Sequence, residues 1–505
     1  MKQKNILEYL EETVQKQPGK TAYTDGTNAL TFQEVFRQAQ AVGTYLHLQN
    51  HQSEPIVVFM KRSPQTVAAF FGCVYAGCFY IPLDEEMPKS RMELIIQKVD
   101  PKGLICDNST KKVLENYSYK GAIYCYDEII ETEVDQEELY VIRDRQIDTD
   151  PIYIVFTSGS TGIPKGVTAC HRSVIDYIEA LSGILQADAK TIFGNQVPLY
   201  FDACLKELLC TIKHGGTTYL IPKNLFMFPI KLVEYLNQYQ INTICWVSSA
   251  LTMISGFGVL KKMIPRYLHT VAFGSEVFPV KQFNLWQEAL PDARFINLYG
   301  PTECTGMSCY YVADRTFDPE EVIPIGRPFP NRAVFLLDED NNEVKNSKIG
   351  EICIRGTALT LGYYKNFEKT TEVFVQNPLN TYYPELIYRT GDLGRYNDRG
   401  ELVFVSRKDN QIKHMGHRIE LGEIELHTNR IDYVSTSCCL YDHQKGKIVL
   451  LYLGEPEKKE ILTCLKEKLP RYMLPNKIIP LERMPLTANG KIDRVYLKEE
   501  YVVNS

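Results

Sequence analysis

The sequence lacks any apolar stretch that could cross a membrane, since none reaches the ~18 uninterrupted apolar residues that a spanning helix needs. The amino terminus also lacks a signal peptide, because Glu8, Glu11 and Glu12 lie where its apolar segment would be. We therefore expect no membrane insertion and a cytoplasmic location. Positive charge is not in excess either: the net charge is −6, which disfavours nucleic acid as a partner.

Paired cysteines and metal-ligand spacings are absent as well. The fourteen cysteines include no Cys-x-x-Cys pair, and the nine histidines form no His-Glu-x-x-His pattern. Without an export signal, we expect reduced, buried thiols and no structural metal. The 505 residues are too many for one core, so two or more domains are expected.

One stretch, Thr157 to Gly166, has the composition of a phosphate-binding loop. It holds three glycines, four hydroxyl side chains and one lysine, and it follows a strand-like run at 152–156. Glycines let backbone N–H groups approach an anion, hydroxyls donate to phosphate oxygens, and lysine adds a compact charge. A solvated turn is the alternative. The stretch is not a Walker A loop, because Lys165 is followed by glycine and not by serine or threonine.

The rest of the chain predicts an α/β protein with a small second domain. Thr31 is a candidate N-cap for a helix over 31–48, and Glu34 would complete its capping box. Apolar strands then alternate with helical patterns, which is typical of parallel sheets. The expected segments are helix 7–14, strand 55–60, helix 64–76, strand 79–83, helix 91–99, strand 103–106, helix 231–238 and strands 241–247 and 271–273.

From about residue 323 the strands become shorter and turns more frequent, which predicts a small β subdomain with strands at 333–337, 351–354 and 402–405. The polar run 406–411 is a candidate linker. A compact α+β tail follows, with a helix at 424–428, a hairpin around 442–446 and a helix containing Ile461 and Leu465. We place the large N-terminal domain at residues 1–407 and the small C-terminal domain at residues 408–505.

Four further stretches stand out in order along the chain. Taken singly, each has an ordinary explanation: turns for the Gly-Pro and Asn-Gly pairs, a loop for Gly391-Asp392, and a solvated helix start for 420–425. The stretches are Asn297-Leu298-Tyr299-Gly300-Pro301-Thr302-Glu303, Tyr388-Arg389-Thr390-Gly391-Asp392-Leu393, Gly416-His417-Arg418-Ile419-Glu420-Leu421-Gly422-Glu423-Ile424-Glu425 and Pro485-Leu486-Thr487-Ala488-Asn489-Gly490-Lys491-Ile492-Asp493.

Together with the glycine-rich loop, these stretches resemble the adenylate-forming (ANL) enzymes, specifically the amino-acid adenylation domains of nonribosomal peptide synthesis and the D-alanine–carrier protein ligases. The resemblance extends from Leu30-Thr31-Phe32 to Lys491. It implies that ATP and Mg²⁺ are used to join a carboxylate to the α-phosphate with release of pyrophosphate. The phosphopantetheine thiol of a carrier then attacks the acyl-adenylate, after the C-terminal domain has rotated.

The resemblance implies a role for each matching residue of an ATP site. Thr302 would donate to the α-phosphate, and Glu303 would ligate Mg²⁺, which suits one carboxylate plus phosphate oxygens. Tyr299 would stack on adenine, Asp392 would accept the ribose hydroxyls, and Arg407 would add a ribose or phosphate contact. The β- and γ-phosphates would be held by Thr157, Ser158, Gly159, Ser160, Thr161, Gly162 and Lys165.

The resemblance also assigns the catalytic lysine and the moving parts. Lys491 would bridge the substrate carboxylate and the α-phosphate, placing a positive charge where negative charge accumulates. Asp409 matches the hinge, and Gly416 matches the glycine of the thiol tunnel, where a Cβ would obstruct the pantetheine arm. The chain departs from the pattern at Ser406, where glycine is usual, and at Cys304, where threonine is common.

Asp202 resembles the aspartate that pairs with the substrate ammonium in α-amino-acid enzymes, which argues for an amino substrate. Lys206 would need a partner if it points inward, and a glutamate-like side-chain carboxylate would serve. If Lys206 reaches solvent instead, the pocket suits alanine or serine; an aminobenzoate is a third possibility. The remaining pocket positions are Ala203, Cys245, Ala272, Gly274, Leu298, Gly306 and Met307, with Ala272 and Gly274 placed to within one residue.

We therefore expect a monomeric, stand-alone amino-acid adenylating ligase that loads a separate phosphopantetheinylated carrier protein, because the sequence ends twelve residues after Asp493. One alternative is an acyl-CoA or aminoaryl-acid ligase of the same superfamily; Asp202 disfavours the acyl-CoA ligase. Another is a catalytically silent nucleotide-binding relative, which is disfavoured by the intact residues Lys165, Glu303, Asp392 and Lys491. Lipoteichoic acid D-alanylation and a small peptide product are both open.

Overall fold

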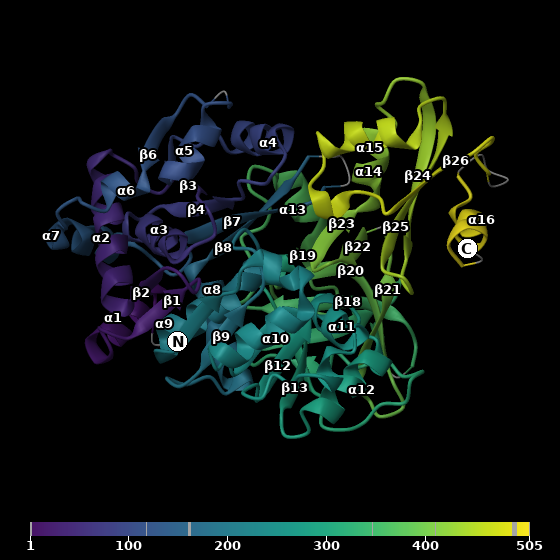
Figure 1. The fold of residues 1–505 in the computed structure, drawn as a ribbon, viewed down its shortest axis with the longest axis horizontal. Coiled ribbons are helices and arrows are strands. Elements are labelled where there is room, and N and C mark those ends of the chain that lie inside the picture. Colours follow the sequence, from purple (N-terminus) through teal and green to yellow (C-terminus); the bar gives the residue numbers. More distant parts are fainter. Residues whose placement is uncertain are drawn as a thin grey trace. The chain divides into compact units, whose positions relative to one another are not determined.

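The computed structural model describes residues 3–117, 119–159, 163–345, 347–409, 411–486 and 492–503. Its contacts divide the chain into two compact units, which are described separately (Figure 1). The first unit comprises Met1–Glu85, Val99–Val155 and Gly166–Lys408; the second comprises Glu86–Lys98, Phe156–Lys165 and Asp409–Ser505. Most of the glycine-rich loop and a short helical segment of the N-terminal sequence therefore group with the C-terminal segment.

A nine-stranded sheet of the first unit carries four of the nine predicted pocket residues, Cys245, Ala272, Gly274 and Leu298. Its strand order is β15-β14-β13-β12-β11-β9-β10-β1-β2, and the strands from β13 to β1 run parallel. The strands are β1 Thr21–Thr24, β2 Ala29–Thr31, β9 Ile192–Asn195, β10 Thr217–Leu220, β11 Thr243–Val247, β12 Thr270–Gly274, β13 Arg294–Tyr299, β14 Cys309–Val312 and β15 Arg327–Pro328. The helices between these strands and before them are α1 Leu7–Lys16, α2 Phe32–Leu48, α8 His171–Leu185, α9 Leu205–His214, α10 Pro229–Gln238, α11 Ser248–Gly256 and α12 Val280–Ala289.

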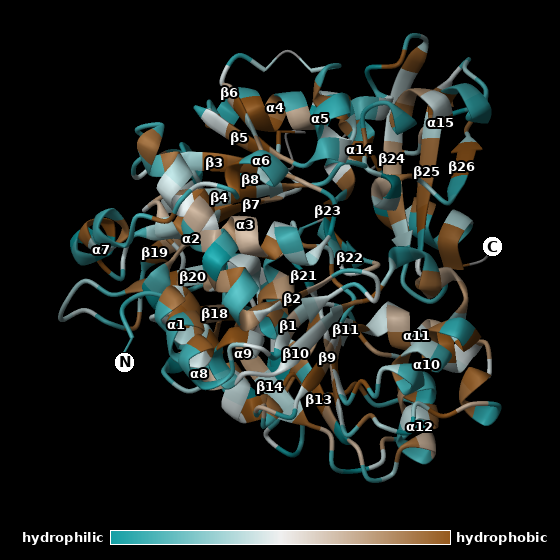
Figure 2. Ribbon diagram, turned by 60° about the vertical axis from the view of Figure 1, so that its left-hand side comes forward, coloured by the Kyte–Doolittle hydropathy of each residue, from teal (hydrophilic) through white to brown (hydrophobic). Residues whose placement is uncertain are grey.

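A second sheet, with the order β6-β5-β3-β4-β7-β8, leads into the glycine-rich loop. Strands β3 and β4 and helix α3 are buried and mostly apolar, as the alternating pattern predicts (Figure 2). The elements of this region are β3 Pro55–Phe59, α3 Pro64–Tyr75, β4 Phe79–Leu83, α4 Lys89–Val99, β5 Gly103–Cys106, α5 Asn108–Leu114, β6 Ala122–Cys125, α6 Tyr126–Ile129, α7 Gln136–Arg145, β7 Pro151–Thr157 and β8 Lys165–Cys170.

The predicted β subdomain is an antiparallel sheet with the order β17-β16-β18-β20-β19, and β21 pairs with β20. The prediction of a linker at 406–411 is wrong in part: Ser406 and Arg407 belong to β21, where Arg407 pairs with Asp392 of β20. The elements are β16 Arg332–Leu337, β17 Glu343–Val344, β18 Gly350–Gly356, α13 Phe367–Val373, β19 Phe374–Gln376, β20 Leu386–Tyr396 and β21 Leu402–Arg407.

The second unit contains the predicted α+β tail, with a two-stranded sheet, a three-stranded sheet and its own apolar core. The predicted hairpin is formed by β24 and β25, and the predicted helix at 424–428 begins earlier, at Leu421. The elements are β22 Gln411–His414, β23 His417–Glu420, α14 Leu421–Thr428, β24 Val434–Asp442, β25 Lys447–Gly454, α15 Lys458–Lys466, β26 Lys477–Pro480 and α16 Arg494–Lys498.

The predicted start of α2 is confirmed. Thr31 caps α2, and its side chain and that of Glu34 form the expected capping box. All fourteen cysteines are free; thirteen are buried and Cys464 is exposed. No helix in the described part of the chain combines the length and apolarity needed to cross a membrane. Within the same residues, no three His, Cys, Asp or Glu side chains form a potential metal cluster. The fold class is the predicted one, a large α/β unit and a small α+β unit.

Candidate active site

Tyr299, Asp392 and Arg407 form a connected group in the first unit. The Tyr299 hydroxyl donates to Asp392 Oδ2 at 2.6 Å, and Arg407 Nη1 donates to the other oxygen of the same carboxylate. Tyr299 ends β13, whereas Asp392 and Arg407 pair across β20 and β21, so two sheets supply the group. Burial raises the pKa of Tyr299, and the Asp392 carboxylate raises it further. The phenol therefore stays protonated and can donate.

Glu303 lies on the short 3-10 helix η4 (Thr302–Cys304), immediately after β13, and is fully buried. Its Oε1 accepts a hydrogen bond from the hydroxyl of Tyr363 at 2.6 Å. The Glu303 carbonyl accepts from the backbone N–H of Thr360 at 3.0 Å, so the segment that carries Tyr363 is joined to η4 at two points. The position of the Glu303 carboxylate is thereby fixed in a buried setting.

Asp202 lies on the 3-10 helix η1 (Asp202–Cys204) and is 7% exposed. Burial raises the pKa of this carboxyl; the charge of Lys206 is the strongest influence that opposes this rise, followed by the nearby Thr302 side chain. The backbone N–H of Gly306 acts in the same direction. The structure therefore brings together residues that the sequence places about one hundred positions apart: the predicted ammonium partner, Asp202, and the predicted α-phosphate donor, Thr302.

The pocket residues on the strands share one face of the nine-stranded sheet. Cys245 pairs with Ala272, and Gly274 pairs with Leu298, in the registers of β11, β12 and β13. Because side chains alternate along a strand, Ala272 and Gly274 lie on this face, and Phe273 lies on the opposite one. Phe273 packs in the separate apolar core there. Ala272 and Gly274 therefore share a sheet face with Cys245 and Leu298, and Phe273 does not.

Glycine is required at two of these pocket positions. At Gly306 the backbone φ is +76°, and a Cβ would lie 2.8 Å from the ring of Tyr177. At Gly274 a Cβ would lie 2.1 Å from the carbonyl oxygen of Leu298 on the neighbouring strand. Both approaches are closer than a side chain tolerates, so only glycine fits at these two positions without a shift of the neighbouring atoms. Met307, next in sequence, is buried, and its carbonyl accepts from Arg332.

Lys206 is 4% exposed and lies on α9, so the alternative in which it reaches solvent is not what the structure shows. Among the described residues no hydrogen bond or ion pair to its ammonium is found. Its charge still acts on its surroundings: it lowers the pKa of Asp202 and of Glu207 against the effect of burial. Burial raises the pKa of Glu207 to about 7, and Asn195 donates to this carboxylate at 3.3 Å.

The described part of the glycine-rich loop belongs to the second unit. Gly159 is tightly enclosed, since a Cβ there would lie 2.1 Å from the carbonyl oxygen of Ile163. The Thr157 hydroxyl is buried and has no hydrogen-bond partner among the described residues. An unpartnered buried hydroxyl beside a close-approach glycine fits a loop that receives phosphate oxygens. The loop residues Ser160, Thr161 and Gly162 lie outside the described residues.

The predicted catalytic Lys491 also lies outside the described residues, between Leu486 and Ile492, which form an isolated bridge in the second unit. Asp409, the predicted hinge, is the first residue of the C-terminal segment of that unit. Its carboxylate accepts from the Gln411 N–H at 3.2 Å. Gly416, the predicted tunnel residue, has φ +79° in the turn between β22 and β23.

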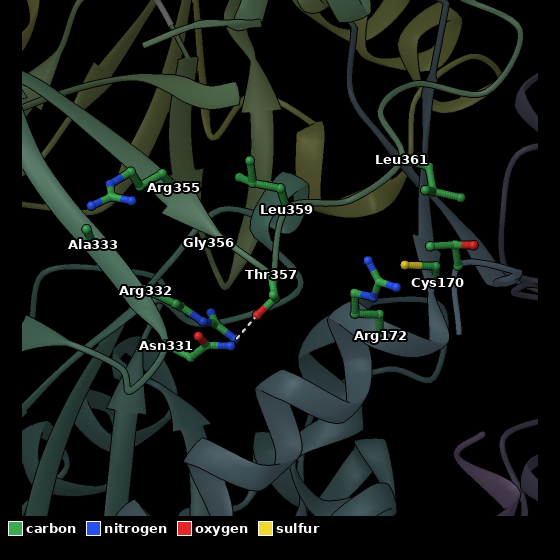
Figure 3. Close-up of a pocket in the computed structure, with 11 residues that line it drawn as sticks. Cys170, Arg172, Asn331, Arg332, Ala333, Arg355, Gly356, Thr357, Leu359 and Leu361 are labelled. Carbon is green, nitrogen blue, oxygen red and sulfur yellow. Dashed lines mark hydrogen bonds between the residues drawn. The ribbon is translucent and has the colours of Figure 1, made fainter. Parts of the chain in front are cut away.

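A separate cavity of about 640 Å³ lies in the first unit and is lined by none of the predicted site residues (Figure 3). It presents Arg172, Arg332 and Arg355, and Asn331 donates to Thr357 across one side at 2.6 Å. Each of the three arginines already forms an ion pair with a carboxylate, at 2.7 to 3.3 Å. The cavity is therefore electrically balanced and does not form a second anion site.

Comparison with known proteins places this arrangement in a class. The fold is that of an adenylation domain: the adenylation domain AlmE of Vibrio cholerae, solved with glycyl-adenosine-5'-phosphate, has a TM-score of 0.85 at 20% identity and covers 99% of this chain and 98% of its own. The amide bond synthetase McbA of Marinactinospora thermotolerans also has a TM-score of 0.85, at 17% identity, with 98% of this chain and 99% of its own covered. At such identities the likeness concerns the fold alone.

The sequence comparisons identify the family. The chain belongs to the AMP-binding enzyme family, whose model matches residues 10–364. The D-alanine–D-alanyl carrier protein ligase of Bacillus licheniformis is 31% identical, with 99% of this chain and 100% of the relative covered. Tyrocidine synthase 1 of Brevibacillus parabrevis is 29% identical over 98% of this chain, but this chain spans only 45% of that protein. The resemblance drawn from the ordered motifs is thereby confirmed.

Several functional residues were missed by sequence reasoning. Tyr363 carries no local signal, because its link to Glu303 joins positions sixty residues apart. Glu207 was not predicted because it lies on the amphipathic helix α9, where a glutamate is usually exposed. The interpretation of 420–425 as a solvated helix start is wrong, since Glu420 and Glu423 are 7% and 1% exposed. The sequence around Glu420 and Glu423 does not indicate that they are buried, because the cations that pair with them, Lys165 and Arg91, lie far away in the sequence.

Proposed function

We propose that this protein is an ATP-dependent ligase that activates an amino acid as its adenylate and then transfers it to the phosphopantetheine thiol of a separate carrier protein. The match over the full length of a D-alanine–D-alanyl carrier protein ligase carries this proposal, and the Thr302 side chain lies near enough to Asp202 to lower the pKa of that carboxyl against the effect of burial. In an α-amino acid, one carbon separates the ammonium from the carboxylate. An amino acid held by Asp202 would thus present its carboxylate close to Thr302, and so close to the α-phosphate that Thr302 would contact.

In the first step a substrate carboxylate oxygen attacks the α-phosphorus and pyrophosphate leaves. Thr302 donates to the α-phosphate, while Tyr299, Asp392 and Arg407 hold the nucleoside. The buried Glu303 carboxylate, oriented by Tyr363, fits one ligand of a magnesium ion, which would neutralise phosphate charge. Lys491 would place its ammonium at the carboxylate and α-phosphate as negative charge builds up.

In the second step the carrier thiol attacks the adenylate carbonyl and AMP leaves. Asp409 would act as the hinge for this change, and Gly416 would line the path of the pantetheine arm. The end-to-end match with a D-alanine–D-alanyl carrier protein ligase supports both the carrier acceptor and the amino-acid substrate.

The first step is tested by ATP–pyrophosphate exchange across a panel of L- and D-amino acids and aminobenzoates. We expect exchange that depends on one amino acid or a small group. Lys491→Ala should abolish it, and Lys466→Ala, which changes an exposed lysine of α15, should not. Absence of exchange with every member of the panel, or full exchange in Lys491→Ala, would contradict the proposal.

The same panel settles what Lys206 does. A preference for glutamate or aspartate would assign the Lys206 ammonium to the substrate side chain. A preference for alanine or serine would assign its charge to the neighbouring Glu207, and Lys206→Met would then affect stability more than selectivity. Product analysis with a phosphopantetheinylated carrier and with free coenzyme A would distinguish a carrier ligase from an acyl-CoA ligase.

A further inference from the structure

Two carboxylates occupy the anion donors of the glycine-rich loop within the second unit. Glu423 Oε2 accepts from the backbone N–H of Gly159 at 3.3 Å. Glu420 Oε1 lies 3.5 Å from Lys165 Nζ, with both side chains about nine-tenths buried. A carboxylate on a loop N–H and a second one on the loop lysine have the charge and acceptor geometry of phosphate oxygens.

A further cation faces the same place. Arg91 of α4 is 4% exposed, and its Nη1 donates to Glu423 Oε1 at 2.5 Å. The Glu423 carboxylate therefore bridges the guanidinium and the Gly159 N–H. None of the sequence motifs includes Arg91. Without the carboxylate, the buried guanidinium would lose this ion pair, which is strongly unfavourable unless another anion takes its place.

The hydroxyl of Ser158 is engaged by the same segment. It donates to the carbonyl of Arg418 at 2.7 Å and accepts from the Glu420 N–H at 3.1 Å. Three donors of the loop are thus bound by residues 418–423: the hydroxyl of Ser158, the backbone N–H of Gly159 and the ammonium of Lys165. Donors that are filled in this way cannot bind phosphate oxygens at the same time.

We propose that Arg91, Gly159 and Lys165 form one anion site that holds either the polyphosphate end of the nucleotide or the carboxylates of Glu420 and Glu423. The inference rests on the proposed function for its ligand, pyrophosphate or the β- and γ-phosphates. Arg91 is then a further phosphate-binding residue. Glu420 and Glu423 are internal competitors that re-occupy the site when pyrophosphate has left.

Charge supports the exchange. Two cations, Arg91 and Lys165, face two carboxylates in this structure. Burial lowers the pKa of Lys98, and the charge of the nearby Lys165 lowers it further; the Lys98 ammonium donates to the carbonyl of Pro164 at 3.1 Å. A polyphosphate carries more negative charge than the two carboxylates together, so it can displace them from such a site at sufficient concentration.

The test is calorimetric titration of the full chain with inorganic pyrophosphate, without amino acid or carrier. Neutralising one competitor in Glu423→Gln or Glu420→Gln should raise pyrophosphate affinity roughly tenfold, the effect of one charge-assisted hydrogen bond. Glu93→Gln, the same change at a partly exposed glutamate of α4, should leave the affinity unaltered. Adding Arg91→Met to Glu423→Gln should remove the gain.

A structural role alone gives a different result. If the Arg91–Glu423 pair only joins two elements, Glu423→Gln lowers the unfolding midpoint and leaves pyrophosphate affinity unchanged, which overturns the inference. Should this variant not fold, Glu420→Gln decides in the same assay. The assay contains no amino acid, so failure of the proposed ligase activity would leave it valid. Conversely, full ligase activity with unchanged pyrophosphate affinity in both variants would refute only the competition.

Discussion

Removing the hydroxyl of Tyr363 tests whether the orientation of Glu303 matters for the first step. In Tyr363→Phe the ring stays and the 2.6 Å hydrogen bond to the buried Glu303 carboxylate is lost. Hydrogen bonds to charged groups contribute about 1.5–3 kcal/mol. If this whole amount supports magnesium-assisted adenylation, exchange should fall roughly 10- to 150-fold, at about 1.4 kcal/mol per tenfold.

The assay is ATP–pyrophosphate exchange over a range of Mg²⁺ concentrations. We expect the half-saturating Mg²⁺ concentration to rise, because a carboxylate free to turn is a poorer ligand. Tyr364→Phe is the matched control. It removes the same group from the next residue of the segment, whose ring packs against Phe79. If Tyr363→Phe folds and exchanges within threefold of the unaltered protein at every Mg²⁺ concentration, Glu303 does not depend on Tyr363 and the argument fails.

Three further changes probe other parts of the first unit. Gly306→Ala places a Cβ 2.8 Å from the Tyr177 ring at a φ of +76°; it should cost about 1–3 kcal/mol in urea unfolding and raise KM for the amino acid. Asp392→Asn should raise KM for ATP roughly tenfold and leave KM for the amino acid unchanged in steady-state exchange. Burial lowers the pKa of His171 to about 3 from 6.5, so the unfolded chain binds this proton first and stability falls as pH drops from about 6.5 towards 3. The loss at pH 5 is about 2 kcal/mol, and urea midpoints of His171→Asn should lack this part of the pH dependence.

Local signals in the sequence were sufficient to predict the strands and helices of the parallel sheets. Each strand there is a short apolar run, and each intervening helix has apolar residues at regular helical spacing. These signals failed where polar residues form strands. Arg407 lies in β21 because Asp392 pairs with it across the sheet, and only that long-range pairing distinguishes the run from a linker. The position of the motif from Tyr299 to Glu303 could be predicted from the sequence, because the apolar strand β13 ends at Tyr299.

The same limit applies to the site. Asp202, Thr302 and Gly306 were predicted as members of a motif set, but their contact is a property of the folded chain. Arg91 and Glu423 are 332 residues apart, and nothing in either neighbourhood indicates that each buries the other. Glu423 therefore resembled a solvated helix start, since an acidic residue in the first turn of a helix is normally exposed and favourable there.

The buried carboxylates of Glu303 and Glu423 have different kinds of partner, and we infer different roles for them from this difference. Glu303 accepts a hydrogen bond from the neutral hydroxyl of Tyr363. A neutral donor fixes the direction of a carboxylate without cancelling its charge, which suits a carboxylate that binds a ligand cation such as a metal ion. Glu423 is held instead by the Arg91 guanidinium, which neutralises it. A carboxylate that is already neutralised is suited to occupy an anion site and not to bind a cation, and this difference is what the Glu423→Gln titration measures.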